Sequence, residues 1–244
     1  MGSVDAICFD LDETLCDSEL SDHEFNNRVF QRAGIDPIFS PWELRAIDPE
    51  DIERENKRRS SNGDSIKGIA GFYTNLYRAT VRSIDTDIEA ESSLIEELGK
   101  IAGELYDPTA VTFREGAEET LKYAREHYKV GLITNGKKET QMAKLEELGI
   151  TDAFDTVVIC DPTKGISGKP ASEPFETALA DLSTSAKNTI HVGNSHGEDI
   201  LGAHNAGFQT VWVPMNRAHE ELSSEPDPAP TYRVEMLGEL RSIL

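Results

Sequence analysis

Five short apolar runs, most of them separated by segments with helical periodicity, restrict the fold of this chain more than any other feature. They occupy residues 4–9, 130–134, 156–160, 189–192 and 210–213. Apolar strands that alternate with helices are typical of a parallel sheet whose two faces are both covered by helices. The sequence therefore predicts an α/β fold with a Rossmann-like parallel sheet.

The first two runs are separated by a long stretch without a strand signal. Apolar residues recur at helical spacing over residues 25–33, 66–84 and 94–105. Each such stripe needs an apolar partner, so together they indicate a bundle of helices. We predict an α-helical domain over residues 17–112, inserted into a core domain made of residues 1–16 and 113–244.

Acidic residues greatly outnumber basic ones. The chain has 45 Asp and Glu against 24 Lys and Arg, a formal net charge of −21 spread along its length. Such a surface repels nucleic acids and anionic membranes, so we expect neither as a partner. An ordinary acidic enzyme could carry this charge, but we favour adaptation to a salt-rich, halophilic cytoplasm, where salt screens the repulsion.

Several absences point to the cytoplasm. No run of about 18 apolar residues could span a membrane, and the N-terminus lacks the basic and apolar regions of a secretory signal. The three cysteines are an odd number without C-x-x-C spacing, which argues against disulfides and zinc. We expect buried, reduced cysteines at positions 8 and 160. The oligomeric state is not indicated, and a monomer is compatible with the sequence.

Polar residues follow the predicted strands at the edge where parallel sheets bind ligands. Asp10 and Asp12 follow the first strand. One carboxylate could attack as a nucleophile while the other exchanges a proton. After the second run, Thr134, Asn135 and Gly136 offer a hydroxyl and N–H groups for an anion, although an ordinary helix N-cap would use the same residues.

Two further strand ends complete the set. Lys169, in the segment after the third run, could neutralise a phosphoryl group or could simply be a solvated surface residue. Asn194 and Asp199 follow the fourth run and could supply oxygen ligands to Mg²⁺. An acid at position 199 could equally complement the dipole of the helix that starts there. Each of these motifs is weak evidence of a catalytic site when taken alone. Their occurrence at successive strand ends, in this order along the chain, is stronger evidence.

Together these motifs resemble those of the haloacid dehalogenase superfamily. The four motifs are Asp10-Leu11-Asp12-Glu13-Thr14, Thr134-Asn135, Lys169-Pro170 and residues 193–203. The inserted helices resemble the α-helical cap of one subclass. One departure is Asn194, because the family usually has a metal-binding acid at this position.

The resemblance implies a Mg²⁺-dependent phosphatase acting on small phosphorylated metabolites. Asp10 would form an aspartyl-phosphate, while Asp12 would first protonate the leaving group and then deprotonate water. Thr134, Asn135 and Lys169 would hold the phosphoryl oxygens, with Gly136 beside them. The implied Mg²⁺ ligands are Asp10, the Asp12 carbonyl, Asn194 and Asp199.

Other functions remain open at this stage. A 2-haloacid dehalogenase would share the fold, but a departing halide needs no proton, so Asp12 would have no task. A phosphomutase would use the same two aspartates, and a catalytically weak binding or regulatory protein would fit Asn194. In the helical domain, Arg45 is the residue we predict to face the substrate, whereas Tyr73 and Tyr77 fit packing. His191 and His196 receive no role.

Overall fold

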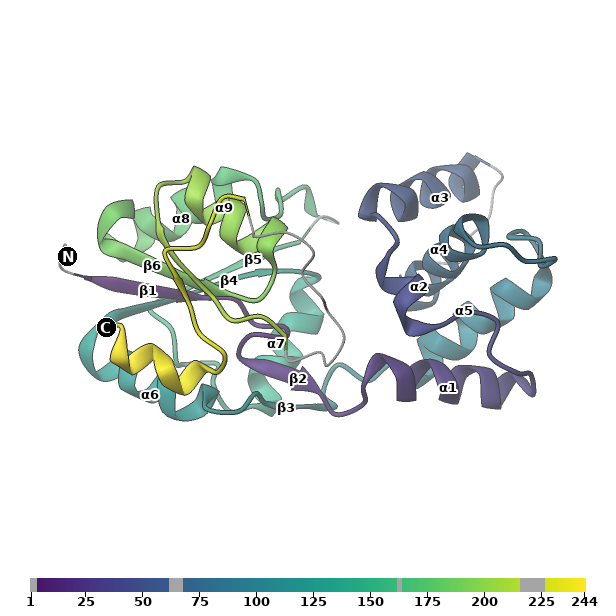
Figure 1. Ribbon diagram of the computed structural model, residues 1–244, viewed down its shortest axis with the longest axis horizontal. Helices are drawn as coiled ribbons and strands as arrows, with labels where there is room; N and C mark the ends of the chain where they lie inside the picture. Colours follow the sequence, from purple (N-terminus) through teal and green to yellow (C-terminus); the bar gives the residue numbers. More distant parts are fainter. Residues whose placement is uncertain (1–3, 62–67, 162–163, 216–226) are drawn as a thin grey trace. The chain divides into compact units, whose positions relative to one another are not determined.

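The computed structural model describes residues 4–61, 68–161, 164–215 and 227–244. The chain forms two compact units (Figure 1). One contains Met1–Glu19 with Pro108–Leu244, and the other contains Leu20–Asp107. Ile66, which belongs to a predicted helical stripe, lies outside the described residues.

The first unit is built on a six-stranded parallel sheet with the strand order β5-β4-β1-β6-β7-β8. The predicted α/β class is confirmed. All five predicted strands form, and the structure adds a two-residue strand at one edge. Their bounds are β1 (Ala6–Phe9), β4 (Lys129–Asn135), β5 (Thr156–Cys160), β6 (Thr189–Gly193), β7 (Gln209–Trp212) and β8 (Tyr232–Arg233).

Strand β1 lies inside the sheet, between β4 and β6, and its four residues are fully buried. Successive side chains of a strand point to opposite faces of its sheet. Accordingly, Ile7 and Phe9 join the apolar cluster on one face, whereas Ala6 and Cys8 join the cluster on the other. An apolar run with two buried faces is what a parallel sheet requires.

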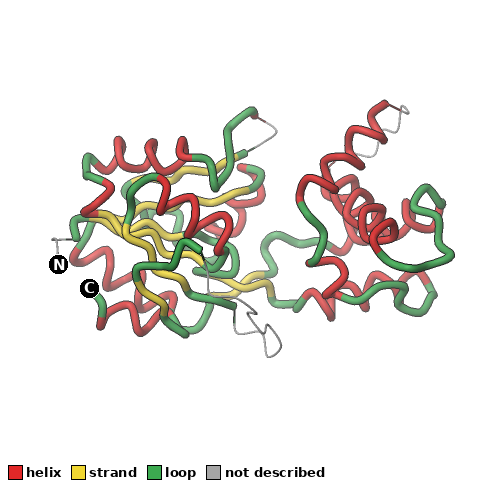
Figure 2. The backbone as a smooth tube through the Cα atoms, turned by 45° about the horizontal axis from the view of Figure 1, so that its top comes forward, coloured by secondary structure: helices red, strands yellow, loops and turns green. Residues whose placement is uncertain are grey.

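Helices cover both faces of this sheet (Figure 2). Apolar residues of α6, α7 and η4 pack in the cluster of Ile7, and those of α8 and α9 pack in the cluster of Cys8. Near the end of the chain, η4 docks on the cluster of Ile7 through buried Leu237 and Leu240. The bounds are α6 (Ala117–His127), α7 (Lys138–Glu147), α8 (Ser172–Leu182), η2 (Ala186–Asn188), the π-helical turn η3 (His196–Ile200), α9 (Leu201–Asn205) and η4 (Leu237–Ser242).

A short antiparallel ladder joins the two ends of the insertion. Strand β2 (Cys16–Ser18) pairs with β3 (Val111–Phe113), and both belong to the first unit. The sequence-based boundaries at 16/17 and 112/113 therefore differ slightly from the division at 19/20 and 107/108. Three-residue strands carry too little alternation to be recognised in the sequence.

The second unit contains five helices within residues 20–61 and 68–107. They are α1 (Asp22–Ala33), α2 (Pro41–Arg45), α3 (Pro49–Ser61), α4 (Gly68–Ser83) and α5 (Ser93–Leu105). Two capping boxes begin α1 and α2, where Ser21 pairs with Glu24 and Ser40 with Glu43. Tyr77 on α4 is fully buried in the apolar core of this unit, as predicted.

Two glycines on α5 allow close packing against α4. A Cβ atom added at Gly99 would lie 2.0 Å from Thr74 Oγ1, and one at Gly103 would lie 2.8 Å from Ala70 Cβ. Larger residues at these positions would push the helices apart. Within the described ranges of the chain, no helix is long and apolar enough to cross a membrane.

Candidate active site

The chain turns sharply just after β1, and this turn carries the two predicted carboxylates. The backbone N–H of Asp10 donates to the carbonyl of Val192 on β6, so that Asp10 stays in line with the sheet. Glu13 adopts a positive φ of 57°, a conformation that few residues other than glycine adopt. Asp12 and Glu13 therefore leave the sheet in a tight loop.

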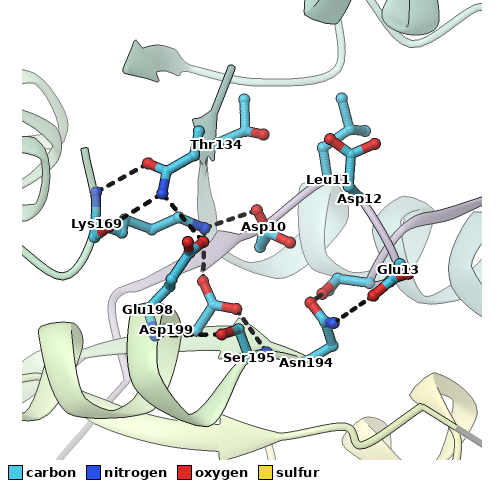
Figure 3. Close-up of polar contacts among 12 residues, drawn as sticks. Asp10, Leu11, Asp12, Glu13, Thr134, Lys169, Asn194, Ser195, Glu198 and Asp199 are labelled. Atoms are coloured by element: carbon cyan, nitrogen blue, oxygen red, sulfur yellow. Dashed lines mark hydrogen bonds and ion pairs between the residues drawn. The ribbon is translucent and has the colours of Figure 1, made fainter. Parts of the chain in front are cut away.

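A buried lysine links the ends of β1 and β6 (Figure 3). The Lys169 Nζ atom lies 2.6 Å from Asp10 Oδ1 and 2.6 Å from Asp199 Oδ1. Its side chain is only 1% exposed. Lys169 is thus not the solvated surface residue that the sequence left open, because it forms the centre of a buried ionic group.

Burial controls the protonation of this group. It raises the pKa of Asp10 to about 7, an effect that the carboxylates of Asp199 and Asp12 enhance and Lys169 opposes. Burial also acts to raise the pKa of Asp199, but Lys169 and His191 hold that pKa below its usual range. The pKa of Lys169 is raised, because the two carboxylates outweigh the effect of burial.

Asp199 is held by three protein donors. Its Oδ1 atom contacts both Lys169 and Nε2 of His191, at 3.0 Å, and its Oδ2 atom accepts from the backbone N–H of Ser195 at 3.0 Å. Gly193 makes room for this carboxylate, since a Cβ atom there would lie 2.2 Å from Asp199 Cγ. These contacts favour Asp199 as the partner of Lys169, and its direct binding to a metal stays a prediction.

The end of β4 meets the loop after β1 through helix α7. Gln141 Nε2 donates to Thr134 Oγ1 at 2.6 Å and to Asp12 Oδ2 at 2.8 Å. Lys144, one helical turn further on, places Nζ 2.5 Å from Asp12 Oδ1. Because the Thr134 oxygen accepts the amide hydrogen, its own hydroxyl hydrogen is available to a bound anion.

Asn135 and Gly136 make contacts that differ from an anion cradle. Asn135 Oδ1 accepts the backbone N–H of Lys169 at 2.8 Å, and Asn135 Nδ2 donates to Glu198 Oε2 at 3.0 Å. The backbone N–H of Gly136 donates to the carbonyl of Cys160. These residues tie the Lys169 segment to the sheet, and their contact with a phosphoryl group stays a prediction.

Asn194, the departure from the family pattern, faces the loop after β1. Its Oδ1 atom accepts the hydroxyl of Thr14 at 3.2 Å, and its Nδ2 atom donates to Glu13 Oε2 at 3.1 Å. Its backbone carbonyl accepts the indole N–H of Trp212 at 2.8 Å. The side chain is therefore oriented by hydrogen bonds on both its oxygen and its nitrogen.

A pocket of about 440 Å³ opens at this edge of the sheet. Among the described residues its lining includes five carboxylates but no lysine or arginine, because Lys169 is buried beneath Asp10. No three His, Cys, Asp or Glu side chains in the described part of the chain are arranged around a metal. The lining residues are Asp10, Asp12, Glu13, Thr134, Asn135, Asn194, Ser195, Glu198, Asp199, Trp212, Pro214 and Met215.

Comparison with known proteins identifies the family. Residues 4–207 match haloacid dehalogenase-like hydrolases. The chain belongs to this family. The match covers most of the core unit and the whole helical insertion, in agreement with the resemblance seen in the sequence.

Curated relatives of the family include several phosphatases. A pyrimidine 5'-nucleotidase, YjjG, from Escherichia coli is 37% identical over 131 residues, which is 53% of this chain and 55% of that protein. A ribulose-1,5-bisphosphate 5-phosphatase from Halopiger xanaduensis is 34% identical over 134 residues, 52% of this chain and 55% of that protein. The chain thus spans about half the length of these relatives.

Solved structures of the family share the fold along the whole chain. A predicted phosphoglycolate phosphatase from Haemophilus somnus has a TM-score of 0.70 at 18% identity, covering 100% of this chain and 99% of the other. The hydrolase YfnB from Bacillus subtilis, bound to magnesium, has a TM-score of 0.65 at 20% identity and covers 100% of this chain and 99% of the other. At these identities the likeness establishes the fold alone.

Sequence reasoning missed some polar residues of this site. Gln141 and Lys144 lie on α7, and only their burial shows that they face inward. Glu198 received no role from the sequence, because its neighbour Asp199 is the predicted functional acid of the fourth motif. His191 received no role from the sequence, yet it is fully buried and contacts Asp199.

Arg45 belongs to the helical unit rather than to this pocket. Its guanidinium pairs with Asp22 at 2.6 Å and lies over the ring of Trp42. Its predicted contact with the substrate therefore stays a prediction.

Proposed function

We propose that this protein is a Mg²⁺-dependent phosphatase that hydrolyses small phosphomonoesters through an aspartyl-phosphate on Asp10. The observation that carries the proposal is the position of Asp10. It directly follows the interior strand β1, contacts the buried Lys169 at 2.6 Å, and lines one pocket with Asp12 and Thr134. The curated relatives support it, because the names of the nucleotidase and of the sugar phosphatases describe phosphate ester chemistry.

In the first step, an Asp10 carboxylate oxygen attacks phosphorus, and the bond between phosphorus and the leaving oxygen breaks. Asp12 donates a proton to that oxygen. Thr134 donates its hydroxyl hydrogen to the phosphoryl group, and Lys169 lies beneath the reacting carboxylate to offset negative charge. These groups are fixed before the substrate binds, which avoids reorganisation during the reaction.

In the second step, water attacks the phosphorus of the aspartyl-phosphate. Asp12, now ionised, accepts a proton from that water, and the bond between phosphorus and the Asp10 oxygen breaks. Inorganic phosphate leaves, and both carboxyl groups return to their starting state. One residue thus serves as acid and then as base.

The pocket suits a hard cation. Its carboxylates outnumber the single lysine beneath it, and burial raises the pKa of Asp10, so a nearby cation would favour the ionised nucleophile. The Asp10 carboxylate, the Asp12 carbonyl, the Asn194 side-chain oxygen and the Asp199 carboxylate would hold Mg²⁺, which prefers oxygen ligands. When bound, Mg²⁺ would neutralise charge shared by the carboxylate and the phosphoryl group.

Asp12 distinguishes this proposal from dehalogenation. A departing halide needs no proton, whereas an alkoxide leaving group does. The contacts of Asp12 with Gln141 and Lys144 keep a carboxyl group at the mouth of the pocket. We also propose that the helical unit serves as a cap that shapes substrate choice, with Arg45 as one of its contacts.

Hydrolysis of a panel of phosphomonoesters tests the proposal. The panel contains 4-nitrophenyl phosphate, nucleotides, sugar phosphates and phosphoglycolate, assayed with Mg²⁺ or with a chelator. We expect Mg²⁺-dependent release of phosphate from at least the aryl ester and one metabolite class. Release of halide from 2-haloacids without phosphate release would overturn the proposal.

A further inference from the structure

The side chain of Asp12 is held by helix α7. Both of its carboxylate oxygens contact side chains of this helix, Oδ2 with Gln141 and Oδ1 with Lys144. These two residues lie three apart and so share one face of the helix. That face is directed toward the carboxyl ends of β1 and β4, whereas the apolar Leu145 packs in the core.

Gln141 connects three oxygens from two different strand ends. Its Nε2 atom lies 2.8 Å from Asp12 Oδ2, 2.6 Å from Thr134 Oγ1 and 3.2 Å from the carbonyl of Asn135. Gln141 is 1% exposed, so water does not compete for these contacts. A single amide therefore fixes the distance between the acid/base and the phosphate-binding hydroxyl.

Lys144 supplies a buried positive charge outside the group around Lys169. It is 9% exposed, although a lysine on a helix can ordinarily extend into water. The ion pair joins a lysine side chain that is 11% exposed to an Asp12 side chain that is 42% exposed. The Lys144 ammonium group thus restricts the rotation of the Asp12 carboxylate, which is partly exposed to solvent.

We propose that Gln141 and Lys144 are positioning residues that orient Asp12 for proton transfer and Thr134 for phosphoryl binding. This inference rests on the proposed phosphatase function and extends it to residues of α7. Misplacement of a catalytic group by about 1 Å can cost about 100-fold in rate. The loss should be greatest where proton donation to the leaving group matters most.

Substituted phenyl phosphates isolate that step, because they share one shape and differ in how easily the phenolate leaves. A nitrophenolate departs without a proton, whereas phenolate and methoxyphenolate need more help. For Lys144→Met and Gln141→Leu, we expect kcat/KM with phenyl phosphate to fall about 10- to 100-fold. With 4-nitrophenyl phosphate, we expect kcat/KM to fall by a clearly smaller factor.

Two further variants separate positioning from folding. Lys144→Arg keeps the charge and should restore most of the rate with phenyl phosphate. Lys122→Met makes the matched change at an exposed position of α6 and should leave both substrates unaffected. Thermal unfolding of every variant identifies any that lose the fold. If Lys144→Met is unfolded, the rate of a folded Lys144→Arg variant with phenyl phosphate shows whether the charge at this position orients Asp12.

The outcomes are distinct. A wild-type protein without Asp10-dependent hydrolysis would overturn the phosphatase proposal, and this inference with it. An active wild-type protein whose Lys144→Met and Gln141→Leu variants lose the same factor with every phenyl ester would overturn this inference alone. A larger loss for the poorer leaving groups, reversed by Lys144→Arg, would support it.

Discussion

Both units of this protein bury charged side chains, but they balance them differently. In the helical unit, Glu55 is 3% exposed and pairs with Arg58 and Arg82, whose side chains are 56% and 37% exposed. In the core unit, Lys169 and Asp199 are each 1% exposed and Asp10 is 9% exposed. In the helical unit, buried Glu55 thus pairs with two partly exposed arginines, whereas the core unit encloses two carboxylates with one lysine.

The difference indicates which charges serve folding and which serve chemistry. Breaking a buried pair leaves an uncompensated charge, so pairs such as that of Glu55 hold a structure together. A buried group with an excess carboxylate costs stability, and burial lowers the pKa of His191, which opposes its acting as a second cation in this group. Such uncompensated groups are typical of functional sites.

The largest effect should follow from Asp10→Asn. We expect activity to fall by about 10⁴-fold or more, since an amide cannot attack phosphorus. Folding should not suffer, because Lys169 and Asp199 then form a balanced pair. Activity assays and thermal unfolding of the same sample check the loss of activity and the unchanged stability. A strongly destabilised variant would contradict the view that the buried group of the core serves chemistry rather than folding.

The opposite result is expected for Glu55→Gln in the helical unit. The free energy of unfolding should fall by about 1–3 kcal/mol, because a buried carboxylate and its two arginine contacts are lost. The catalytic rate of the folded protein should stay close to the wild-type rate. Glu53→Gln, at an exposed position of the same helix, is the matched control and should change stability by about 0.5 kcal/mol or less.

Asn194→Asp sharpens the comparison by adding one more carboxylate to the core pocket. A charged oxygen attracts a divalent cation more strongly than an amide oxygen does, so we expect Mg²⁺ to bind about tenfold more tightly. Without Mg²⁺ the variant should unfold at a lower temperature than the wild type. Calorimetric titration measures the affinity, and unchanged binding would remove residue 194 from the ligand set.

Salt should act on the surface charges of both units more than on the buried group of the core. The Debye length shrinks from about 30 Å at 0.01 M to about 3 Å at 1 M, so repulsion from the net charge of −21 is largely screened. We expect Tm to rise steeply with KCl while activity persists. A flat or falling Tm in melts across this range would contradict salt adaptation.

The sheet and the order of the site residues could be predicted from the sequence because both follow local rules. Strands of a parallel sheet are apolar runs, and polar residues after them meet at one edge, so Asp10, Thr134 and Asp199 were found without coordinates. Strands β2, β3 and β8 were missed, since two or three residues carry no period.

Contacts between distant segments were not predictable in this way. Nothing in the local sequence shows that Lys144 reaches back to Asp12, 132 positions earlier, or that Gln141 is buried. Asn135 was assigned to phosphate, which stays a prediction; that its amide also holds the Lys169 segment could not be foreseen, because this contact depends on how the loops pack. Tertiary packing decides the partner of a polar side chain, whereas the sequence decides which strand end it follows.

The phosphorylation state of Asp10 during turnover tests the central claim most directly. In Asp12→Asn, 4-nitrophenyl phosphate can still phosphorylate Asp10, while the water that would remove the group lacks its base. Acid quenching followed by peptide mass spectrometry should therefore find one phosphoryl group on the peptide that carries Asp10, at that residue. Continued hydrolysis with Asp10 unmodified, or a phosphoryl group on another residue, would contradict the account.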